Sequence, residues 1–263
     1  MDLRSALIEN LQTRPSLLVA YSGGVDSALL AHLAVEALGE DRVLCVLLDS
    51  PLMPRRAVRE AIETAGVLDL PLEIVSLPIL DNPRFRANPP DRCYHCRTMS
   101  ARILREMARE KGFDTVADGA NRSDLGEYRP GLVACGEAGI VHPFVEVGIG
   151  KEDVRRIARE DGLPVWNRPS DACLATRIPY GDPIDPGDLR QVEEAEEILH
   201  RWGFSPLRAR KHGDIARIEV AADAFPDLLA VREEVVRALR EIGFVHVTLD
   251  LRGFRSGSMD EGR

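Results

Sequence analysis

The sequence predicts an α/β fold in which a parallel sheet has helices on both faces, followed by a small C-terminal α+β domain. In the first half, short apolar runs alternate with segments of helical periodicity, as in a parallel sheet enclosed by helices. Gly23 and Gly24 stand directly between the first apolar run and an amphipathic segment. After Pro186 the order changes to helix, two strands, helix and strand. We therefore expect a first domain at residues 1–185 and a second at residues 186–263.

The elements of the first domain follow from the spacing of their apolar residues. Short continuous apolar runs are typical of strands buried on both faces, and they predict strands at residues 16–21, 43–48, 72–77 and 114–119. Apolar residues three and four positions apart predict helices at residues 27–38, 55–65, 96–111 and 151–160. Residues 163–187 are rich in proline and turn residues and predict an active-site segment that leads to the boundary.

The second domain is compact and mixed. The same reasoning predicts helices at residues 189–202 and 228–242 and strands at residues 207–212, 216–221 and 245–251. Neither half contains an internal repeat or a low-complexity segment.

Composition narrows the class of protein. The chain has 263 residues, with 34 Lys and Arg against 43 Asp and Glu, for a net charge of −9. This acidic balance argues against a broad nucleic-acid surface, so we expect no nucleic-acid partner. No apolar stretch is long enough to cross a membrane, and the N-terminus does not resemble an export signal. Five cysteines without such a signal argue against structural disulfides, and we expect a cytoplasmic protein.

The loop between the first strand and the first helix carries the clearest chemical signal. Glycines allow the backbone to approach a ligand closely, and the amides at a helix N-terminus favour an anion. Serine hydroxyls add donors, and a carboxylate there is placed to hold Mg²⁺ beside a polyphosphate. The candidate residues are Ser22, Gly23, Gly24, Asp26 and Ser27. The alternative is an ordinary strand-to-helix turn in which Asp26 only caps the helix.

Two further segments follow predicted strands. Ligands in open α/β sheets bind at the carboxyl ends of the strands. The strand at residues 114–119 ends at Gly119, and Asn121 and Asp124 follow it. All three are candidates for contact with a nucleotide or a metal, unless they only form an Asn/Asp turn. Ser50 follows the strand at residues 43–48 and is a weaker candidate for contact with an adenine or a ribose.

Three cysteines are candidates for sulfur or metal chemistry. Cys93 and Cys96 have CxxC spacing near the start of a predicted helix, which fits a zinc half-site, a redox pair, cluster ligands or two unrelated thiols. Cys173 lies in the proline-rich segment between Arg168 and Arg177, and its alternative is a packed side chain.

The motif SGGVDS at residues 22–27 resembles the PP-loop of the ATP pyrophosphatases, also called adenine nucleotide alpha hydrolase-like proteins. The segment DGANRSD at residues 118–124 matches a second motif that borders the nucleotide in that superfamily. The resemblance implies that ATP is cleaved between its α and β phosphates with Mg²⁺. It also implies an adenylated substrate and released pyrophosphate.

Four segments together make the resemblance more specific and extend it over essentially the whole chain. With the loop, RCYHCR at residues 92–97, PSDACLATRIPYG at residues 169–181 and the segment from Arg208 to Glu219 resemble the LarE family of sulfur transferases. That family makes nickel-pincer nucleotide, the lactate racemase cofactor. The resemblance implies that a carboxylate of pyridinium-3,5-biscarboxylic acid mononucleotide is adenylated and becomes a thiocarboxylate, with Cys173 and Asp26 as catalytic residues.

The resemblance leaves two sources of sulfur. Cys173 can be sacrificed and left as dehydroalanine. Alternatively Cys93, Cys96 and Cys173 resemble the three ligands of the subtype that holds a [4Fe-4S] cluster, whose open iron binds an extra sulfide. The second source is the one that the three cysteines favour.

Residues of the second domain are expected to bind the substrate. Arg208 and Arg210 alternate along a predicted strand and therefore share a face, which suits the phosphate of a mononucleotide or, equally, a solvated strand. The resemblance also implies a second acidic and basic site, formed by Glu196, Glu219, Asp227 and Arg255.

Other functions remain open on these residues. A tRNA thiolase or another PP-loop ligase uses the same adenylation, although no dense basic run is present. A protein of another class, a non-catalytic regulator that binds ATP, would keep only the loop. The family resemblance further implies a homo-oligomer, for which a hexamer is one arrangement.

Overall fold

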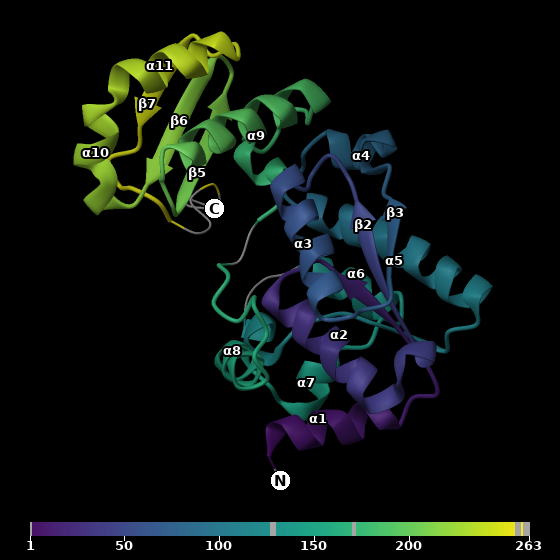
Figure 1. Ribbon diagram of the computed structural model, residues 1–263. Coiled ribbons are helices and arrows are strands. Elements are labelled where there is room, and N and C mark those ends of the chain that lie inside the picture. The colour runs from purple at the N-terminus through teal and green to yellow at the C-terminus, as the bar shows by residue number, and fades with distance from the viewer. Residues whose placement is uncertain (1, 127–129, 170–171, 256–258, 260–263) are drawn as a thin grey trace. The chain divides into compact units, whose positions relative to one another are not determined.

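A computed structural model describes residues 2–126, 130–169, 172–255 and 259 (Figure 1). The chain divides into two compact units. Unit 1 comprises Met1–Ile79 and Asp91–Asp171, and unit 2 comprises Leu80–Pro90 and Ala172–Arg263. Ser170 and Asp171, which belong to the proline-rich motif, lie outside the described residues.

Unit 1 is built on a parallel sheet. Its strands are β1 (Leu17–Tyr21), β2 (Val43–Asp49), β3 (Leu72–Ser76) and β4 (Thr115–Ala117), in the order β3-β2-β1-β4 (Figure 1). Val19 is paired with Cys45 on one side and with Ala117 on the other. All three pairings are parallel, so the carboxyl ends of the strands meet at one edge. The loops that follow β1, β2 and β4 therefore converge there.

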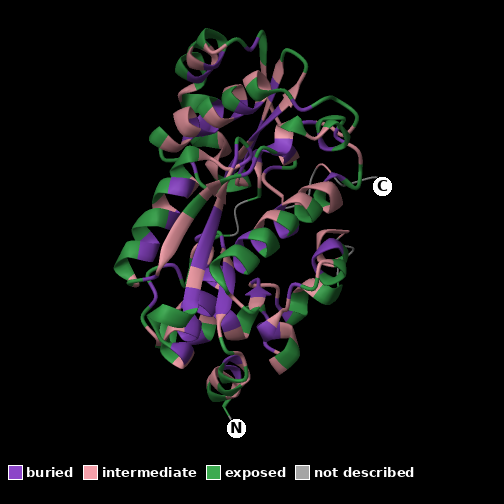
Figure 2. Ribbon diagram, turned by 90° about the vertical axis from the view of Figure 1, so that its right-hand side faces the viewer, coloured by how far each residue is buried: buried purple, intermediate pink, exposed green. Residues whose placement is uncertain are grey.

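Helices cover both faces of this sheet, as predicted. The helices of unit 1 are α1 (Leu3–Gln12), α2 (Val25–Leu38), α3 (Arg55–Val67), α5 (Arg92–Lys111), α6 (Pro130–Glu137), α7 (Pro143–Val147) and α8 (Lys151–Glu160). Leu17 and Val19 of β1 belong to a core shared with α1, α2, α3 and α8. Leu18, which points to the other face, packs with α5. The central strands β1 and β2 are accordingly mostly buried, with some partly buried positions (Figure 2).

Unit 2 contains a second, smaller sheet with the order β5-β6-β7. Its elements are β5 (Leu207–His212), β6 (Ile215–Val220), β7 (His246–Leu249) and the helices α4 (Pro83–Arg86), α9 (Pro186–Arg201), α10 (Phe225–Ala230) and α11 (Arg232–Glu241). The strands β5 and β6 are antiparallel, and β6 and β7 are parallel. Apolar residues from alternate positions of β5 and β6 form a core with α9, α10 and α11. One helix was expected at residues 228–242, but Val231 (φ −106°, ψ 19°) separates two helices.

Short 3-10 helices complete the chain: η1 (Glu40–Arg42), η2 (Ile79–Asp81), η3 (Arg122–Gly126), η4 (Leu174–Arg177) and η5 (Ala222–Ala224). Within the described part of the chain, no helix combines the length and the apolar character that crossing a membrane requires.

The segment 80–90 is tied to residues that follow Cys173. The side-chain amide of Asn88 donates to the carbonyls of Pro179 (2.7 Å) and Asp182 (3.0 Å). The main-chain amide of Ile184 donates to the Arg86 carbonyl (2.8 Å). These bonds explain why residues 80–90 and 172–185 belong to unit 2, whereas the sequence assigned both segments to the first domain.

Candidate functional site

The loop between β1 and α2 can be formed only with glycine at its centre. Gly23 has φ +76°, in the left-handed region, and a Cβ atom built there would lie 2.7 Å from the Ala61 Cα on α3. Any larger residue would therefore collide with the backbone of α3. The main chain of the loop lies against that helix, with its amides at the N-terminus of α2.

Serine hydroxyls hold this loop. The Ser22 amide donates to Ser27 Oγ (3.1 Å), and Ser27 Oγ donates to the Gly24 carbonyl (3.1 Å). Arg168 reaches the same loop, where its Nη1 donates to the Gly23 carbonyl (3.1 Å). The sequence did not single out Arg168 as a residue of the loop.

The residues that follow β4 meet the start of α2. A Cβ atom on Gly119 would lie 2.9 Å from the Ser27 amide nitrogen, so glycine permits the contact. The side chain of Asn121 donates through Nδ2 to Asp26 Oδ1 (2.8 Å). The main-chain amide of Asn121 donates to Asp124 Oδ2 (2.9 Å). The structure thus brings Gly119, Asn121 and Asp124 to the start of α2, where Asp26 lies, and their contact with a nucleotide or a metal stays a prediction.

Asp26 is in an environment that fits a cation. Burial raises the pKa of Asp26 above its ordinary value, the hydrogen bond from Asn121 opposes this, and the charge of Asp124 raises it further. Two carboxylates this close repel each other, and a divalent cation with oxygen ligands would relieve the repulsion. Lys151, which begins α8, also lowers the pKa of Asp26 through its charge. Lys151 was not predicted as a site residue, although the sequence indicates that a helix begins there.

A charged pair lies under the residues that follow β4. His142 Nδ1 donates to Asp118 Oδ1 (2.6 Å), which also accepts from the Ala120 amide (3.0 Å). Burial raises the pKa of Asp118, but the bond from His142 and the charge of Arg97 lower it below its ordinary value. The same hydrogen bond raises the pKa of His142 above its ordinary value. No sequence signal distinguished His142 from any other lone histidine.

Ser50 is buried at the end of β2. Its hydroxyl accepts from the Leu52 amide (3.3 Å), and its carbonyl accepts from Arg55 Nη2 (2.7 Å). These bonds form a turn at the carboxyl edge of the sheet. A contact between Ser50 and a nucleotide stays a prediction.

The cysteines fall into two groups. Cys45 and Cys135 are buried, and burial raises the pKa of Cys135 to about 11. Cys93 is exposed and Cys96 half-buried, both in the first turns of α5, which begins earlier than predicted. Cys173 is half-buried and precedes η4. Cys93 and Cys96 belong to unit 1 and Cys173 to unit 2, so their joint role as ligands stays a prediction.

Three of the charged residues predicted in unit 2 belong to buried ion pairs. Arg210 and Glu219 are buried and form two hydrogen bonds (3.1 and 3.0 Å). Glu196, which could have been a solvated helix residue, is also buried and is paired with Arg177.

The other predicted residues of unit 2 are more accessible. Arg208 lies over the Phe254 ring at 5.2 Å, and Arg255 Nη1 is 3.9 Å from Asp250. Asp227 is exposed in the first turn of α10. Binding roles for Arg208, Arg210, Glu196, Glu219, Asp227 and Arg255 stay predictions.

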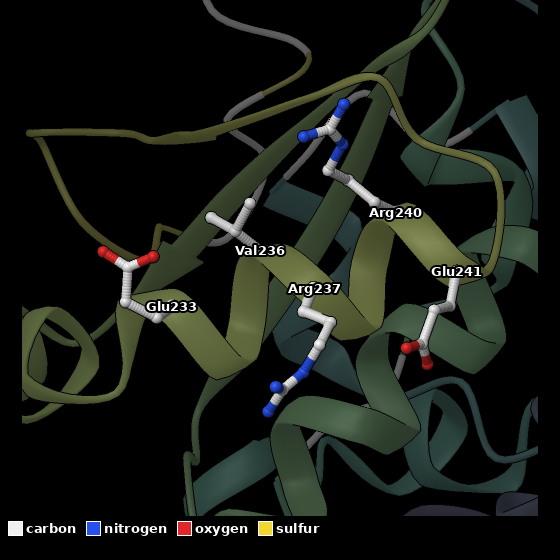
Figure 3. A pocket seen from close by; sticks show the side chains of 5 residues that line it. All are labelled: Glu233, Val236, Arg237, Arg240 and Glu241. Atoms are coloured by element: carbon white, nitrogen blue, oxygen red, sulfur yellow. The ribbon is translucent and has the colours of Figure 1, made fainter.

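A shallow pocket on α11 is separate from these residues. It is lined by Glu233, Val236, Arg237, Arg240 and Glu241, all from one helix (Figure 3). None of the predicted site residues lines it, and we do not assign it to the site.

The parallel sheet, the glycine loop and the Asp26 environment define an ATP-using enzyme of the PP-loop class, whose members use Mg²⁺. Residues 3–85 match the model of the NAD synthase family. The chain is 36% identical to pyridinium-3,5-bisthiocarboxylic acid mononucleotide synthase of Lactiplantibacillus plantarum, over 98% of this chain and 94% of that protein.

Two further relatives have no assigned function. An uncharacterized protein of Synechocystis is 37% identical over 92% of this chain and 91% of its own length. An uncharacterized protein of Methanocaldococcus jannaschii is 32% identical over 97% of each chain. On these similarities, the chain belongs to the LarE family of PP-loop enzymes.

Proposed function

We propose that this enzyme uses ATP to convert a carboxylate of pyridinium-3,5-biscarboxylic acid mononucleotide into a thiocarboxylate, a step in nickel-pincer nucleotide synthesis. The observation that carries the proposal is the contact between Asn121 and Asp26 beside the glycine loop. It joins both ATP motifs in a chain that resembles the Lactiplantibacillus synthase over nearly its full length.

The first step is adenylation. A carboxylate oxygen of the substrate attacks the α-phosphorus of ATP, the bond to the β-phosphate breaks, and pyrophosphate leaves. The amides of Gly23 and Gly24 and the hydroxyls of Ser22 and Ser27 bind the phosphates. Asp26, positioned by Asn121, would hold Mg²⁺ with Asp124 nearby, and a bound ion would supply neutralising charge for the pyrophosphate leaving group. Ser50 lies beside the nucleoside.

The second step is sulfur transfer. In the sacrificial route the Cys173 thiolate attacks the acyl carbon, and AMP leaves. The Cα proton of Cys173 is then removed, its C–S bond breaks, and the thiocarboxylate departs from a dehydroalanine. Half-burial of Cys173 supports this role, because its thiol is accessible.

A second supply of sulfur uses three cysteines. Cys93 and Cys96 are accessible in unit 1 and Cys173 in unit 2, and accessible thiols suit the ligands of a [4Fe-4S] cluster. Such a cluster would supply an open iron that carries an extra sulfide. We favour this supply, because sacrifice of Cys173 gives the cysteines of α5 no role.

The substrate is a small molecule. Of Arg208 and Arg210, which the sequence predicts to bind its phosphate, Arg208 is the less buried and binds it, and Asp227 and Arg255 contribute to the second acidic and basic site. We further propose that the enzyme works in the cytoplasm as a homo-oligomer that binds neither nucleic acid nor membrane.

Release of pyrophosphate and formation of thiocarboxylate, measured separately, test the function. We expect Cys173→Ala to release pyrophosphate at the normal rate and to form no thiocarboxylate. Asp26→Ala should lower pyrophosphate release by about 10²–10³-fold, because the metal site precedes any movement of sulfur. A wild-type protein that binds ATP without pyrophosphate release would instead be a regulator. Thiocarboxylate formation by Cys173→Ala over many turnovers would remove Cys173 from the reaction.

The source of sulfur has its own experiment. After anaerobic purification we expect iron and acid-labile sulfide in the wild type, and a loss of both in Cys93→Ala. Cys45→Ala is the matched control, because Cys45 is buried in the core of unit 1. An iron-free wild type after reconstitution would leave sacrifice of Cys173 as the source.

A further inference from the structure

Arg177 is the largest of the fully buried side chains, with 0% of its surface exposed. It is the last residue of η4, four positions after Cys173. Arginine is almost never fully buried unless its charge is paired. The partners of Arg177 therefore indicate what this charge does in the fold.

One edge of the guanidinium is fixed to α9. Nε of Arg177 donates to Glu196 Oε1 (2.8 Å), and Nη2 donates to Glu196 Oε2 (3.0 Å). Glu196 Oε1 also accepts from the Ala209 amide of β5 (3.1 Å). Both oxygens of Glu196 are thus engaged by the protein, and Arg177 is held against a helix and the edge of a sheet.

The other edge of the guanidinium holds the main chain at Cys173. Nη1 of Arg177 donates to the carbonyls of Ala172 (2.9 Å) and Cys173 (3.3 Å) and to Thr176 Oγ1 (2.8 Å). The Cys173 carbonyl also accepts from the hydroxyl and the amide of Thr176 (2.8 and 3.0 Å). The main chain at Cys173 is therefore fixed where it enters η4.

We propose that Arg177 and Glu196 are positioning residues that set the place of the Cys173 main chain for sulfur transfer. This inference rests on the proposed function and deepens it. Burying an ion pair is a poor way to gain stability, because apolar residues of similar volume do as well or better. An arginine fork gives direction instead, since one edge binds a carboxylate while the other donates to carbonyls. Glu196 consequently acts through Arg177 and not as a ligand of substrate.

The variant Arg177→Lys separates position from charge. A lysine keeps a cation beside Glu196, but its single nitrogen does not serve both Glu196 and the carbonyls of Ala172 and Cys173. We expect the amides of residues 172–178 to exchange hydrogen about tenfold faster. We also expect thiocarboxylate formation to fall about 10²-fold, since small misplacements of a reacting group cost this much. Pyrophosphate release should stay within about twofold.

Arg217→Lys is the matched control. Arg217 is also paired with a buried glutamate, Glu219 (3.1 Å), and it contacts Asp250 and the Met259 sulfur as well. We expect this variant to leave the exchange of residues 172–178 unchanged. If Arg177→Lys does not fold, the double variant Arg177→Met with Glu196→Leu replaces it, because an apolar pair fills the same volume.

Three results would overturn the proposal. The first is hydrogen exchange at residues 172–178 of Arg177→Lys at the same rate as in the wild type. Equal losses of pyrophosphate release and of thiocarboxylate formation would indicate general damage to the protein and reject a positioning role. Normal sulfur transfer by the double variant is the third. Hydrogen exchange needs no substrate, so a wild type that fails to transfer sulfur refutes the proposed function while the exchange result still decides whether Arg177 fixes the segment.

Discussion

The glycine loop of unit 1 (residues 22–27) and the segment of unit 2 that carries Cys173 (residues 172–178) are held in place by different means. In unit 1, backbone approaches backbone where Gly23 meets α3 and where Gly119 meets α2. In unit 2, two buried arginines, Arg177 and Arg210, are each bonded to a buried glutamate. The first arrangement depends on the absence of side chains, and the second depends on long charged ones.

This difference follows from what each region has to present. A phosphate is bound by main-chain amides, so the loop needs close approach and a left-handed residue at Gly23. Cys173 lies directly before a single short 3-10 helix, η4, so buried side chains supply further fixed points. Disruption should therefore be most costly at the charged pairs and milder at the glycines.

The largest effect is expected from Glu219→Leu. This change leaves Arg210 buried and without the carboxylate that also pairs with Arg217. Breaking one side of a buried pair costs roughly 3–5 kcal/mol of the free energy of unfolding. Urea denaturation measures the loss. The double variant Glu219→Leu with Arg210→Met should recover most of it, and equal stability of the single and double variants would contradict a reliance on charge pairing.

A smaller effect is expected from Gly119→Ala. The added Cβ would lie 2.9 Å from the Ser27 amide and 3.0 Å from the Asp26 carbonyl carbon. Overpacking of this kind costs roughly 1–3 kcal/mol, and the shift of Asp26 should weaken ATP binding. Calorimetric titration with ATP checks this result. Gly66→Ala on α3 is the control, because a Cβ atom there meets nothing within 4 Å. Unchanged affinity in Gly119→Ala would show that close approach is not required.

The smallest effect concerns the charged pair of His142 and Asp118, which directly follows β4. The pKa of His142 is raised above 6.5, so its contribution is complete below pH 6.5 and is lost as the pH rises through the folded-state value. The pKa of Asp118 is lowered below 3.8, so its contribution is present above pH 3.8 and is lost as the pH falls through the folded-state value. Between these limits His142→Gln should lower the free energy of unfolding by about 1 kcal/mol.

Denaturation of wild type and His142→Gln across the pH range measures this window. Arg97 and Glu146 also act on His142, with opposite signs, and both keep their charge between pH 6 and 9. A stability difference that grows as the pH rises from 6 to 9 would contradict the assignment of the pair.

The sequence was most informative where periodicity or a motif carried the signal. Buried apolar runs predicted the four parallel strands, and the position of Asn121 after a strand marked it as a candidate site residue, although its contact with Asp26 was not predicted. His142 gave no such signal, and Arg177 was noted only as a neighbour of Cys173, because a lone histidine or arginine looks like a surface residue until its partner is known. Glu196 was assigned to a binding site, yet its carboxylate is engaged by Arg177. In these cases the environment of the side chain depends on a partner distant in the sequence, and the local sequence pattern does not identify that partner.

The route of the chain between its two units limits how this protein can be divided. Residues 80–90 leave unit 1, join unit 2 through Asn88 and return before α5 begins. The connection is therefore made three times, near residues 79, 90 and 171. A single proteolytic cut cannot release unit 2 as one continuous fragment. A fragment that starts at residue 186 would lack Asn88 and also the carbonyls of Pro179 and Asp182, to which the Asn88 side chain donates. Exchange of whole units between relatives would have to transfer an internal insertion together with the C-terminal segment.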